Sequence, residues 1–389
     1  MPIPLPFFTL LLLISFASVN AVLFTPALPN IAHFFNITDG VAEKTITWFL
    51  IGYTLGQLLY GPIANRFGRK PALFFGVSLQ IISSILCVFA GFMHTYWLLI
   101  LGRFFLALGS GVGLKMTFTL VNECYEPKLA SQKIAYLMLA FAIIPGLSVA
   151  LGGLLITYFD WTSCFYAGGI YGFILLFLIS KLPETKTILD LKALQFDHLL
   201  QGYIAQFKNL RLVSGGLLMG STGSFIYLFA TIAPFVAINY FNITTAEYGL
   251  ANLLPPIGLI IGSLIGAQLT NHYSLTTLVK IGITIASLGV LLMLIATALQ
   301  LSALVSLFLP MIIIYFGLSL ILPNASTMAM TQVEDKAHGA AVMSFLNMGL
   351  VTLSVLCIGY FAIGTWLLPT IYLLLCMLMT GLFLWLKRE

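Results

Sequence analysis

The stretch Gly61-Pro62-Ile63-Ala64-Asn65-Arg66-Phe67-Gly68-Arg69-Lys70-Pro71 joins two long apolar runs and carries three basic residues. Its glycines and prolines favour a tight turn, because glycine tolerates unusual backbone angles and proline fixes one of them. The three cations can hold such a turn on one side of a bilayer and can pair with helix ends. We therefore predict a short charged loop between two membrane-spanning helices, with plain topological charge as the alternative interpretation.

The chain around this loop is too poor in charge for a soluble protein. Of its 389 residues, 60% are hydrophobic and 7% are charged, whereas soluble domains carry about 25% charged residues. This composition excludes a soluble enzyme, a disordered protein and a nucleic-acid binder. The cysteines all lie in or beside apolar runs, so we expect small buried hydrophobic residues, no metal site and no cofactor. They are Cys87, Cys124, Cys164, Cys357 and Cys376.

Twelve apolar runs are long enough to cross a bilayer, which takes about 20 residues in a helix. They cover residues 6–35, 43–65, 71–93, 96–123, 131–158, 163–181, 211–240, 246–271, 277–298, 302–330, 337–361 and 365–386. The first run could be mistaken for a secretory signal, but it is too long and no positive segment precedes it. We therefore predict an all-α polytopic membrane protein with twelve transmembrane helices.

Basic residues predict the orientation of these helices, because cytoplasmic loops are enriched in Lys and Arg. If the N-terminus is cytoplasmic, fourteen Lys and Arg residues lie in inner segments and only Lys44 lies in an outer one. Four of the five tryptophans then lie at outer helix ends, where aromatic side chains form a belt. We predict that both termini are cytoplasmic and that the protein is a multi-pass protein of the inner (plasma) membrane.

The two halves of the chain carry an internal repeat. The polar stretch over residues 182–210 separates six predicted helices from six, so we predict two domains, 1–181 and 211–389. This cytoplasmic linker is either a helix along the membrane surface or a flexible tether. Phe35-Asn36-Ile37-Thr38 recurs 206 residues later as Phe241-Asn242-Ile243-Thr244. A duplicated six-helix unit predicts a substrate path near the middle of the membrane, between the halves.

Several of these motifs carry a family resemblance. The loop over residues 61–71 resembles the signature loop of the major facilitator superfamily. Pro26-Ala27-Leu28-Pro29-Asn30-Ile31-Ala32 and Arg103-Phe104-Phe105-Leu106-Ala107-Leu108-Gly109-Ser110-Gly111-Val112-Gly113 are similar to motifs of its bicyclomycin/chloramphenicol-resistance branch of drug:proton antiporters. The resemblance implies two pseudo-symmetric six-helix bundles that work by alternating access. It also implies conformational gating by the loop and its partners, namely Gly61, Asn65, Arg66, Gly68, Arg69 and Glu123.

The chain departs from this branch where coupling is concerned. An acidic residue usually stands four positions before the proline of the first helix, and this chain has Val22. The signature loop usually has an acidic residue in place of Asn65. A Gly-Pro pair associated with antiport is replaced by Ser148-Val149 in the fifth predicted helix. These departures weaken the antiport assignment that the resemblance implies.

Ionisable residues inside the bilayer are costly and usually functional. No carboxylate lies near the middle of a predicted span, but Arg103 and Lys115 lie inside the fourth one. In the family, the arginine that matches Arg103 faces the central cavity and is tied to proton coupling. Buried cations need a counter-charge, which favours an anionic or zwitterionic substrate. Three further polar residues could bind substrate or could only pack between helices: Asn20, Tyr227 and Asn324.

These observations favour a secondary active transporter of a small organic solute. Two hypotheses for its cargo follow from them. The charges favour an anionic metabolite such as a polycarboxylate siderophore, moved by ion or proton coupling. The resemblance favours a multidrug:proton antiporter that exports amphipathic drugs. A membrane receptor fits the repeat poorly, a membrane enzyme would need a catalytic constellation, and no Walker A loop points to ATP. The expected partners are a small molecule and the lipid bilayer, with no nucleic acid, and we expect a monomer.

Overall fold

The computed structural model describes residues 5–186, 189–190, 193, 203–331, 333 and 336–388. Across these residues the chain is helical, and this part contains no strand. The first half contains α1 (Phe7–Val22), η1 (Thr25–Ala27), α2 (Leu28–Phe35), α3 (Asp39–Ala42), α4 (Lys44–Phe67), α5 (Arg69–Phe92), α6 (Tyr96–Ser110), α7 (Val112–Cys124), α8 (Pro127–Tyr158) and α9 (Ser163–Ser180). The second half contains α11 (Leu210–Phe235), η2 (Val236–Tyr240), α12 (Thr245–Ala251), α13 (Pro255–Leu269), α14 (Leu275–Ala298), η3 (Leu304–Phe308), α15 (Leu309–Met330), α16 (Lys336–Ile358) and α17 (Leu367–Arg388).

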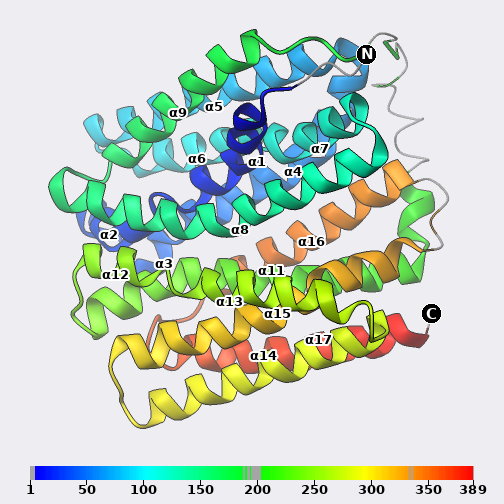
Figure 1. Ribbon diagram of the computed structural model, residues 1–389. Coiled ribbons are helices and arrows are strands. Elements are labelled where there is room, and N and C mark those ends of the chain that lie inside the picture. The colour runs from blue at the N-terminus through cyan, green and yellow to red at the C-terminus, as the bar shows by residue number, and fades with distance from the viewer. Residues whose placement is uncertain are drawn as a thin grey trace.

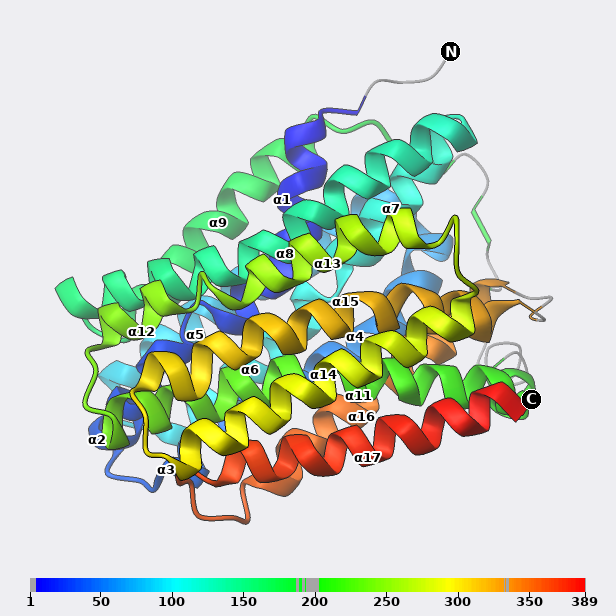
Figure 2. The same cartoon turned by 60° about the horizontal axis from the view of Figure 1, so that its bottom comes forward.

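These elements form two bundles, the N bundle (α1–α9) and the C bundle (α11–α17), which lie one above the other in Figure 1. Within the C bundle, α14 packs against both α15 and α17 (Figure 2). Ten helical stretches in the described residues are long and apolar enough to cross a membrane, and Ile143–Tyr158 within α8 is a shorter apolar helix. The two chain ends lie at the same end of the molecule (Figure 1), which we call the termini side, opposite the far side.

Three of the predicted spans are interrupted, and proline explains the first break. Residues 6–35 form α1, η1 and α2 rather than one helix. Pro26 has no N–H to donate to the carbonyl of Val22, four residues earlier, and the Thr25 hydroxyl donates to that oxygen instead at 2.9 Å. The second break separates α6 from α7 at Gly111, and the third separates α12 from α13 just before Pro255. Hydropathy depends only on how apolar the residues are, so it does not detect any of these three helix breaks.

Backbone geometry repeats between the bundles at the offset of the sequence repeat. Four non-glycine residues have a positive φ in the described chain, and they form two pairs that are 206 residues apart. Asn36 and Asn242 have φ of 53° and 54°, and His94 and Gln300 have φ of 48° and 52°. Each ends or follows a helix, where a left-handed residue lets the chain turn away. The pseudo-symmetric fold predicted from the sequence is therefore confirmed.

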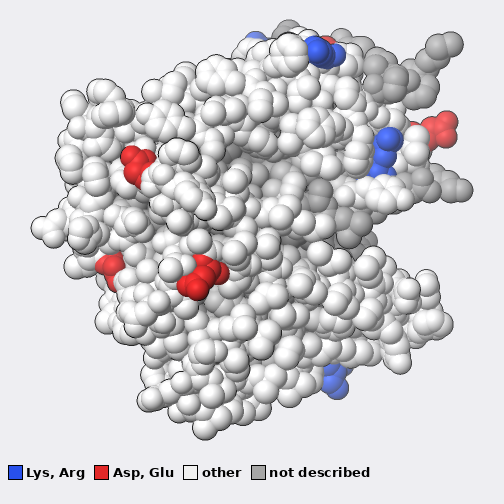
Figure 3. Space-filling model, turned by 60° about the vertical axis from the view of Figure 1, so that its left-hand side comes forward, with Lys and Arg blue, Asp and Glu red and all other residues white. Residues whose placement is uncertain are grey.

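The bundles meet mainly on the far side. Asn239 Nδ2 donates to Asp39 Oδ2 at 3.3 Å across the two bundles. The helices α8 and α12 pack closely there. A Cβ added to Gly153 would lie only 2.7 Å from the carbonyl oxygen of Thr245. The face turned forward in Figure 3 is largely uncharged, with a few acidic side chains on its left-hand half.

The linker is described only in part. Residues 183–186 and 189–190 are not helical, and they run beside the loop that precedes α5. The predicted surface helix falls largely on residues outside the described part, and the predicted domain limits 1–181 and 211–389 stay a prediction.

Candidate functional site

Arg103 is enclosed within the N bundle. It lies two turns into α6, and only 1% of its surface is exposed. Its guanidinium donates to three backbone oxygens: Nη1 to Asn20 at 2.7 Å, Nη2 to Ala21 at 3.4 Å and Nε to Thr45 at 3.4 Å. Two of these oxygens belong to the last turn of α1, where carbonyls lack helical partners and the helix dipole is negative. The helix break thus creates the acceptors that the cation needs.

Two aromatic rings complete the enclosure. The guanidinium carbon lies 3.9 Å from the ring centroid of Phe24 and 4.3 Å from that of Phe49. A guanidinium stacks favourably on aromatic faces, and more so when water is excluded. Arg103 therefore joins α6 to the break after α1 and to the start of α4 without a carboxylate. In this conformation Arg103 is buried, and the cavity-facing position that the resemblance implies stays a prediction.

The Asn20 side chain belongs to a buried polar network. Its Nδ2 donates to the carbonyl of Phe16 at 2.8 Å, and its Oδ1 accepts from Gln80 Nε2 at 2.9 Å. Gln80 also donates to the carbonyl of Gly168 at 3.1 Å, so the network ties α1, α5 and α9 together. Asn324 similarly donates to Leu320 of its own helix at 2.7 Å. These contacts correspond to the packing alternative for both residues.

Lys115 lies on α7 and reaches α4. Its Nζ donates to the carbonyl of Gln57 at 3.2 Å, and a Cβ added to Gly61 would lie 2.8 Å from the same nitrogen. The Gln57 Nε2 atom is buried and has no hydrogen-bond partner within the described residues. One turn along α4, the Thr54 hydroxyl lies 3.3 Å from that of Thr352 on α16. The ammonium therefore lies near the contact between the bundles, and among the described residues it donates to one backbone oxygen.

Five tyrosines from the two bundles form a cluster near this contact, and we call it the tyrosine cluster: Tyr53, Tyr227, Tyr248, Tyr315 and Tyr372. Tyr53 on α4 lies near Tyr227 on α11, and Tyr227 lies near Tyr315 on α15. Tyr248 and Tyr372 also lie near Tyr315. The Tyr248 hydroxyl is buried and lies beside the Asn252 side chain. The cluster offers aromatic faces and hydroxyl groups but no charge.

The signature loop is held by a second polar network, on the termini side. Arg69 Nη2 forms an ion pair with Glu123 Oε1 at 2.7 Å, and Arg69 Nη1 donates to Asn65 Oδ1 at 2.8 Å. Asn65 thus supplies the acceptor that an acidic residue supplies in the family pattern. Thr185, in the linker, donates to Glu123 Oε2 at 2.6 Å. Arg66 lies half-exposed at the end of α4, and Gly61 contacts Lys115 rather than this network.

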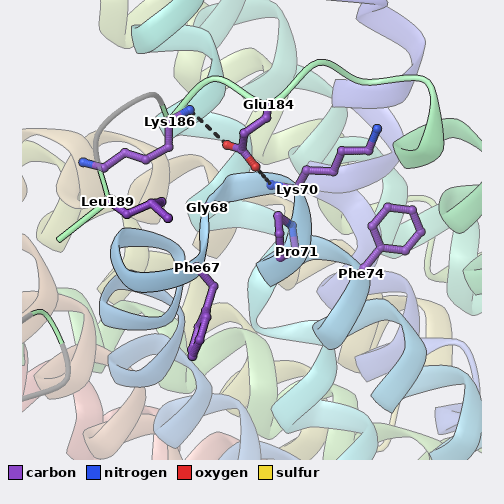
Figure 4. A pocket seen from close by; sticks show the side chains of 8 residues that line it. All are labelled: Phe67, Gly68, Lys70, Pro71, Phe74, Glu184, Lys186 and Leu189. Carbon is purple, nitrogen blue, oxygen red and sulfur yellow. Dashed lines mark hydrogen bonds between the residues drawn. The ribbon is translucent and has the colours of Figure 1, made fainter. Parts of the chain in front are cut away.

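Glu184, which the sequence does not single out, caps α5. Its two carboxylate oxygens accept from the backbone N–H groups of Arg69 and Lys70, both at 2.9 Å. Figure 4 shows the contact with Lys70. A carboxylate is favourable at a helix N-terminus, where four N–H groups lack partners. Gly68 allows this approach, since its φ is +104° and an added Cβ would lie 2.6 Å from Glu184 Oε2. A cavity of about 500 Å³ lies beside this contact, lined in part by Lys186.

Only the glycine at position 68 offered a local sequence signal for this cap, because the carboxylate comes from a segment more than a hundred residues away. Of the predicted gating residues, the structure brings Asn65, Gly68, Arg69 and Glu123 together. Among the predicted substrate residues, Tyr227 lies in the tyrosine cluster. Arg103 contacts Asn20, but through the Asn20 backbone oxygen rather than its side chain.

Comparison with known proteins agrees with this architecture. The family profile described as Major Facilitator Superfamily matches residues 10–355. An uncharacterized transporter of Rickettsia felis is 29% identical over 68% of this chain, and the match spans 64% of that relative's length. The chloramphenicol resistance protein CraA of Acinetobacter baumannii is 24% identical over 84% of this chain and 78% of its own. The crystal structure of a D-xylose-proton symporter has a similar fold, with a TM-score of 0.76, 14% identity and 96% of each chain covered.

Proposed function

Because this chain belongs to the Major Facilitator Superfamily and is a multi-pass membrane transporter rather than an enzyme, we propose that it exports amphipathic, uncharged compounds in exchange for protons. The termini side is then cytoplasmic, as the distribution of basic residues predicts. The far side, which is closed in this conformation, faces outward. Alternating access opens each side in turn around a site between the bundles.

The observation that supports this cargo is the tyrosine cluster. Tyr53 and Tyr227 come from different bundles, and a compound held between them would contact both. Aromatic faces bind apolar rings, and phenol hydroxyls and the Gln57 amide can bind the few polar groups of an amphipathic compound. Relatives of this chain include a chloramphenicol resistance protein. Export of this class of compound therefore fits both the residues and the family.

The same structure weakens the case for an anionic cargo. That case depends on Arg103 needing a counter-charge, but the carbonyls of Asn20, Ala21 and Thr45 already accept from its guanidinium. Lys115 keeps the anionic hypothesis as a second candidate, because its ammonium lies beside the bundle contact with one recorded backbone acceptor. A siderophore or other polycarboxylate would bind there if the second candidate is right.

A resistance assay tests the choice between these functions. The full chain is expressed in a drug-hypersensitive bacterium, and the chloramphenicol concentration that stops growth is measured. We expect the chain to raise this concentration and Tyr227→Phe to reduce the gain, because one lost hydrogen bond is worth about 1 kcal/mol, or about fivefold in affinity. Tyr136→Phe, at an exposed position on α8, is the matched control and should change nothing. No gain in chloramphenicol resistance, together with transport of citrate that disappears in Lys115→Met, would favour the second candidate.

A further inference from the structure

Glu43 is a buried carboxyl group without a partner. It lies between α3 and α4, before the first residue of the spanning helix, and only 1% of its surface is exposed. Neither carboxylate oxygen has a hydrogen-bond partner among the residues that the structure describes. An ionised carboxylate in such a place loses its hydration with nothing in return, so the neutral acid is favoured. Burial accordingly raises the pKa of Glu43 from 4.5 to about 8.

The groups around Glu43 do not replace the missing counter-charge. Tyr96 on α6 interacts with it electrostatically but is uncharged near neutral pH. Arg103, also on α6, directs its guanidinium to backbone oxygens, including that of Thr45. Along the chain, Asp39 lies one turn earlier and Lys44 is exposed. His94, two residues before Tyr96, stacks on Phe34. The carboxyl therefore stays compatible with this structure only when it carries a proton.

The segment that carries Glu43 is also part of the far-side closure. Asp39 accepts the hydrogen bond from Asn239 of the C bundle, and a Cβ added to Gly40 would lie 3.2 Å from the carbonyl oxygen of Gly359. Within the N bundle, the Tyr96 hydroxyl donates to the carbonyl of Val41. Opening of the far side separates Asp39 and Gly40 from their partners in the C bundle. Water then gains access to this segment, and Glu43 can ionise.

We propose that Glu43 is a proton-binding site and that it must be protonated for the far side to close. The proposal rests on the alternating access of the proposed function. A proton from the far-side solution adds to the carboxylate as the bundles approach, and it returns to the same solution when they separate. This proton therefore controls closure and is not the one exchanged for the cargo.

The sign of the pH dependence follows from the two protonation states. Below about pH 4.5 both the open and the closed form hold the proton, so closure does not depend on pH. Between this value and the closed-state pKa of about 8, closure takes up a proton. Each unit of pH then disfavours closure by up to about tenfold, and above about pH 8 the effect levels off. Alkaline conditions on the far side should hold the transporter open.

Distance measurements between two spin labels test this proposal on the full chain in lipid nanodiscs. The labels are attached at Tyr158→Cys on α8 and Leu299→Cys beyond α14, which are 76% and 64% exposed at far-side helix ends of the two bundles. Cys357→Ser removes the exposed native thiol. We expect the short-distance population to fall as the pH rises from about 5 to about 8.5. In Glu43→Gln it should stay high throughout, because the amide cannot ionise.

Three further variants keep the outcome clear. Glu43→Leu replaces Glu43→Gln if the Gln variant folds poorly, and it should likewise keep the short-distance population high at every pH. Glu126→Gln on the termini side is the control, and it should keep the wild-type response. Asp39→Asn should also keep it, although burial raises the pKa of Asp39 as well. A pH response that persists in both Glu43 variants, or that is lost only in Asp39→Asn, overturns the proposal. No substrate is added, so failure of drug export alone would contradict the proposed function and leave this result unaffected.

Discussion

Replacement of Arg103 by lysine distinguishes two roles for this residue: holding the N bundle together and binding substrate as a cation. Both residues are positively charged, but an ammonium cannot reproduce the planar fork that meets three oxygens. A lysine could keep the shortest bond, the 2.7 Å contact with the Asn20 carbonyl. It would lose the two 3.4 Å bonds to Ala21 and Thr45 and the stacked guanidinium plane. If Arg103 holds the N bundle together, this conservative change must destabilise the protein.

The size of the effect can be worked from these contacts. Two long hydrogen bonds contribute about 1 kcal/mol each, at the low end for such bonds. Loss of stacking on the rings of Phe24 and Phe49 adds about 0.5–1 kcal/mol each. We therefore expect Arg103→Lys to lower the free energy of unfolding by about 3–4 kcal/mol. For a chain of this length that corresponds to a fall in apparent melting temperature of about 5 °C.

The native cysteines provide the assay. Cys87, Cys124, Cys164 and Cys376 are buried thiols, so a thiol-reactive fluorophore reports their exposure as the purified protein unfolds on heating. Arg388→Lys, the same substitution at an exposed position of α17, is the matched control and should melt with the wild type. Citrate, a polycarboxylate, should not change the wild-type melting temperature.

Two results would refute the reasoning about Arg103. The first is an Arg103→Lys protein that melts at the wild-type temperature and yet no longer transports. The second is protection of the wild type by citrate that disappears in Arg103→Lys. Either result would assign Arg103 to substrate binding, as the resemblance implies, and would restore the anionic hypothesis.

Two further changes test the packing described above. Glu184→Gln should lower the apparent melting temperature by a few degrees, because the cap of α5 loses its charge. N-cap and dipole interactions are together worth about 1–2 kcal/mol. An unchanged melting curve would mean that the contact between the linker and α5 adds no stability. Gly152→Ala should reduce stability by about 1–3 kcal/mol, because the added Cβ would lie 1.8 Å from the backbone oxygen of Leu23. Gly381→Ala, where nothing lies within 4 Å, should be neutral in the same assay. Equal effects at the two glycines would contradict the close packing described at Gly152.

The sequence predicts the fold well because bilayer crossing depends on the length of apolar runs and repeats preserve backbone geometry. The offset of 206 residues, first seen in Asn36-Ile37-Thr38, returns in the left-handed pairs Asn36 with Asn242 and His94 with Gln300. The helix breaks are less predictable, because Pro26 lies inside a run that is apolar on both sides. A proline in an apolar run allows either a kinked helix or a break.

The sites are less predictable because their partners are tertiary. The sequence identifies Arg103 as an unusual cation, but its acceptors are backbone oxygens, which no residue pattern reveals. Glu184 caps α5 only because the linker folds back onto the loop. Glu43 reads as an ordinary helix-end carboxylate in the sequence, and only its burial makes it unusual. Charge patterns thus located the signature-loop network, but they suggested a cargo that the structure supports less well.

The central claim, proton-driven export of an uncharged amphipathic compound, is tested most directly in proteoliposomes with an acidic lumen. Chloramphenicol is uncharged, so a pH gradient alone does not trap it. Antiport lets protons leave the lumen and drug enter, and we predict that labelled chloramphenicol accumulates above its external concentration. Collapse of the gradient should release the accumulated chloramphenicol, and Tyr227→Phe should slow its accumulation. Accumulation of citrate instead, or of neither compound under the gradient, would contradict the account.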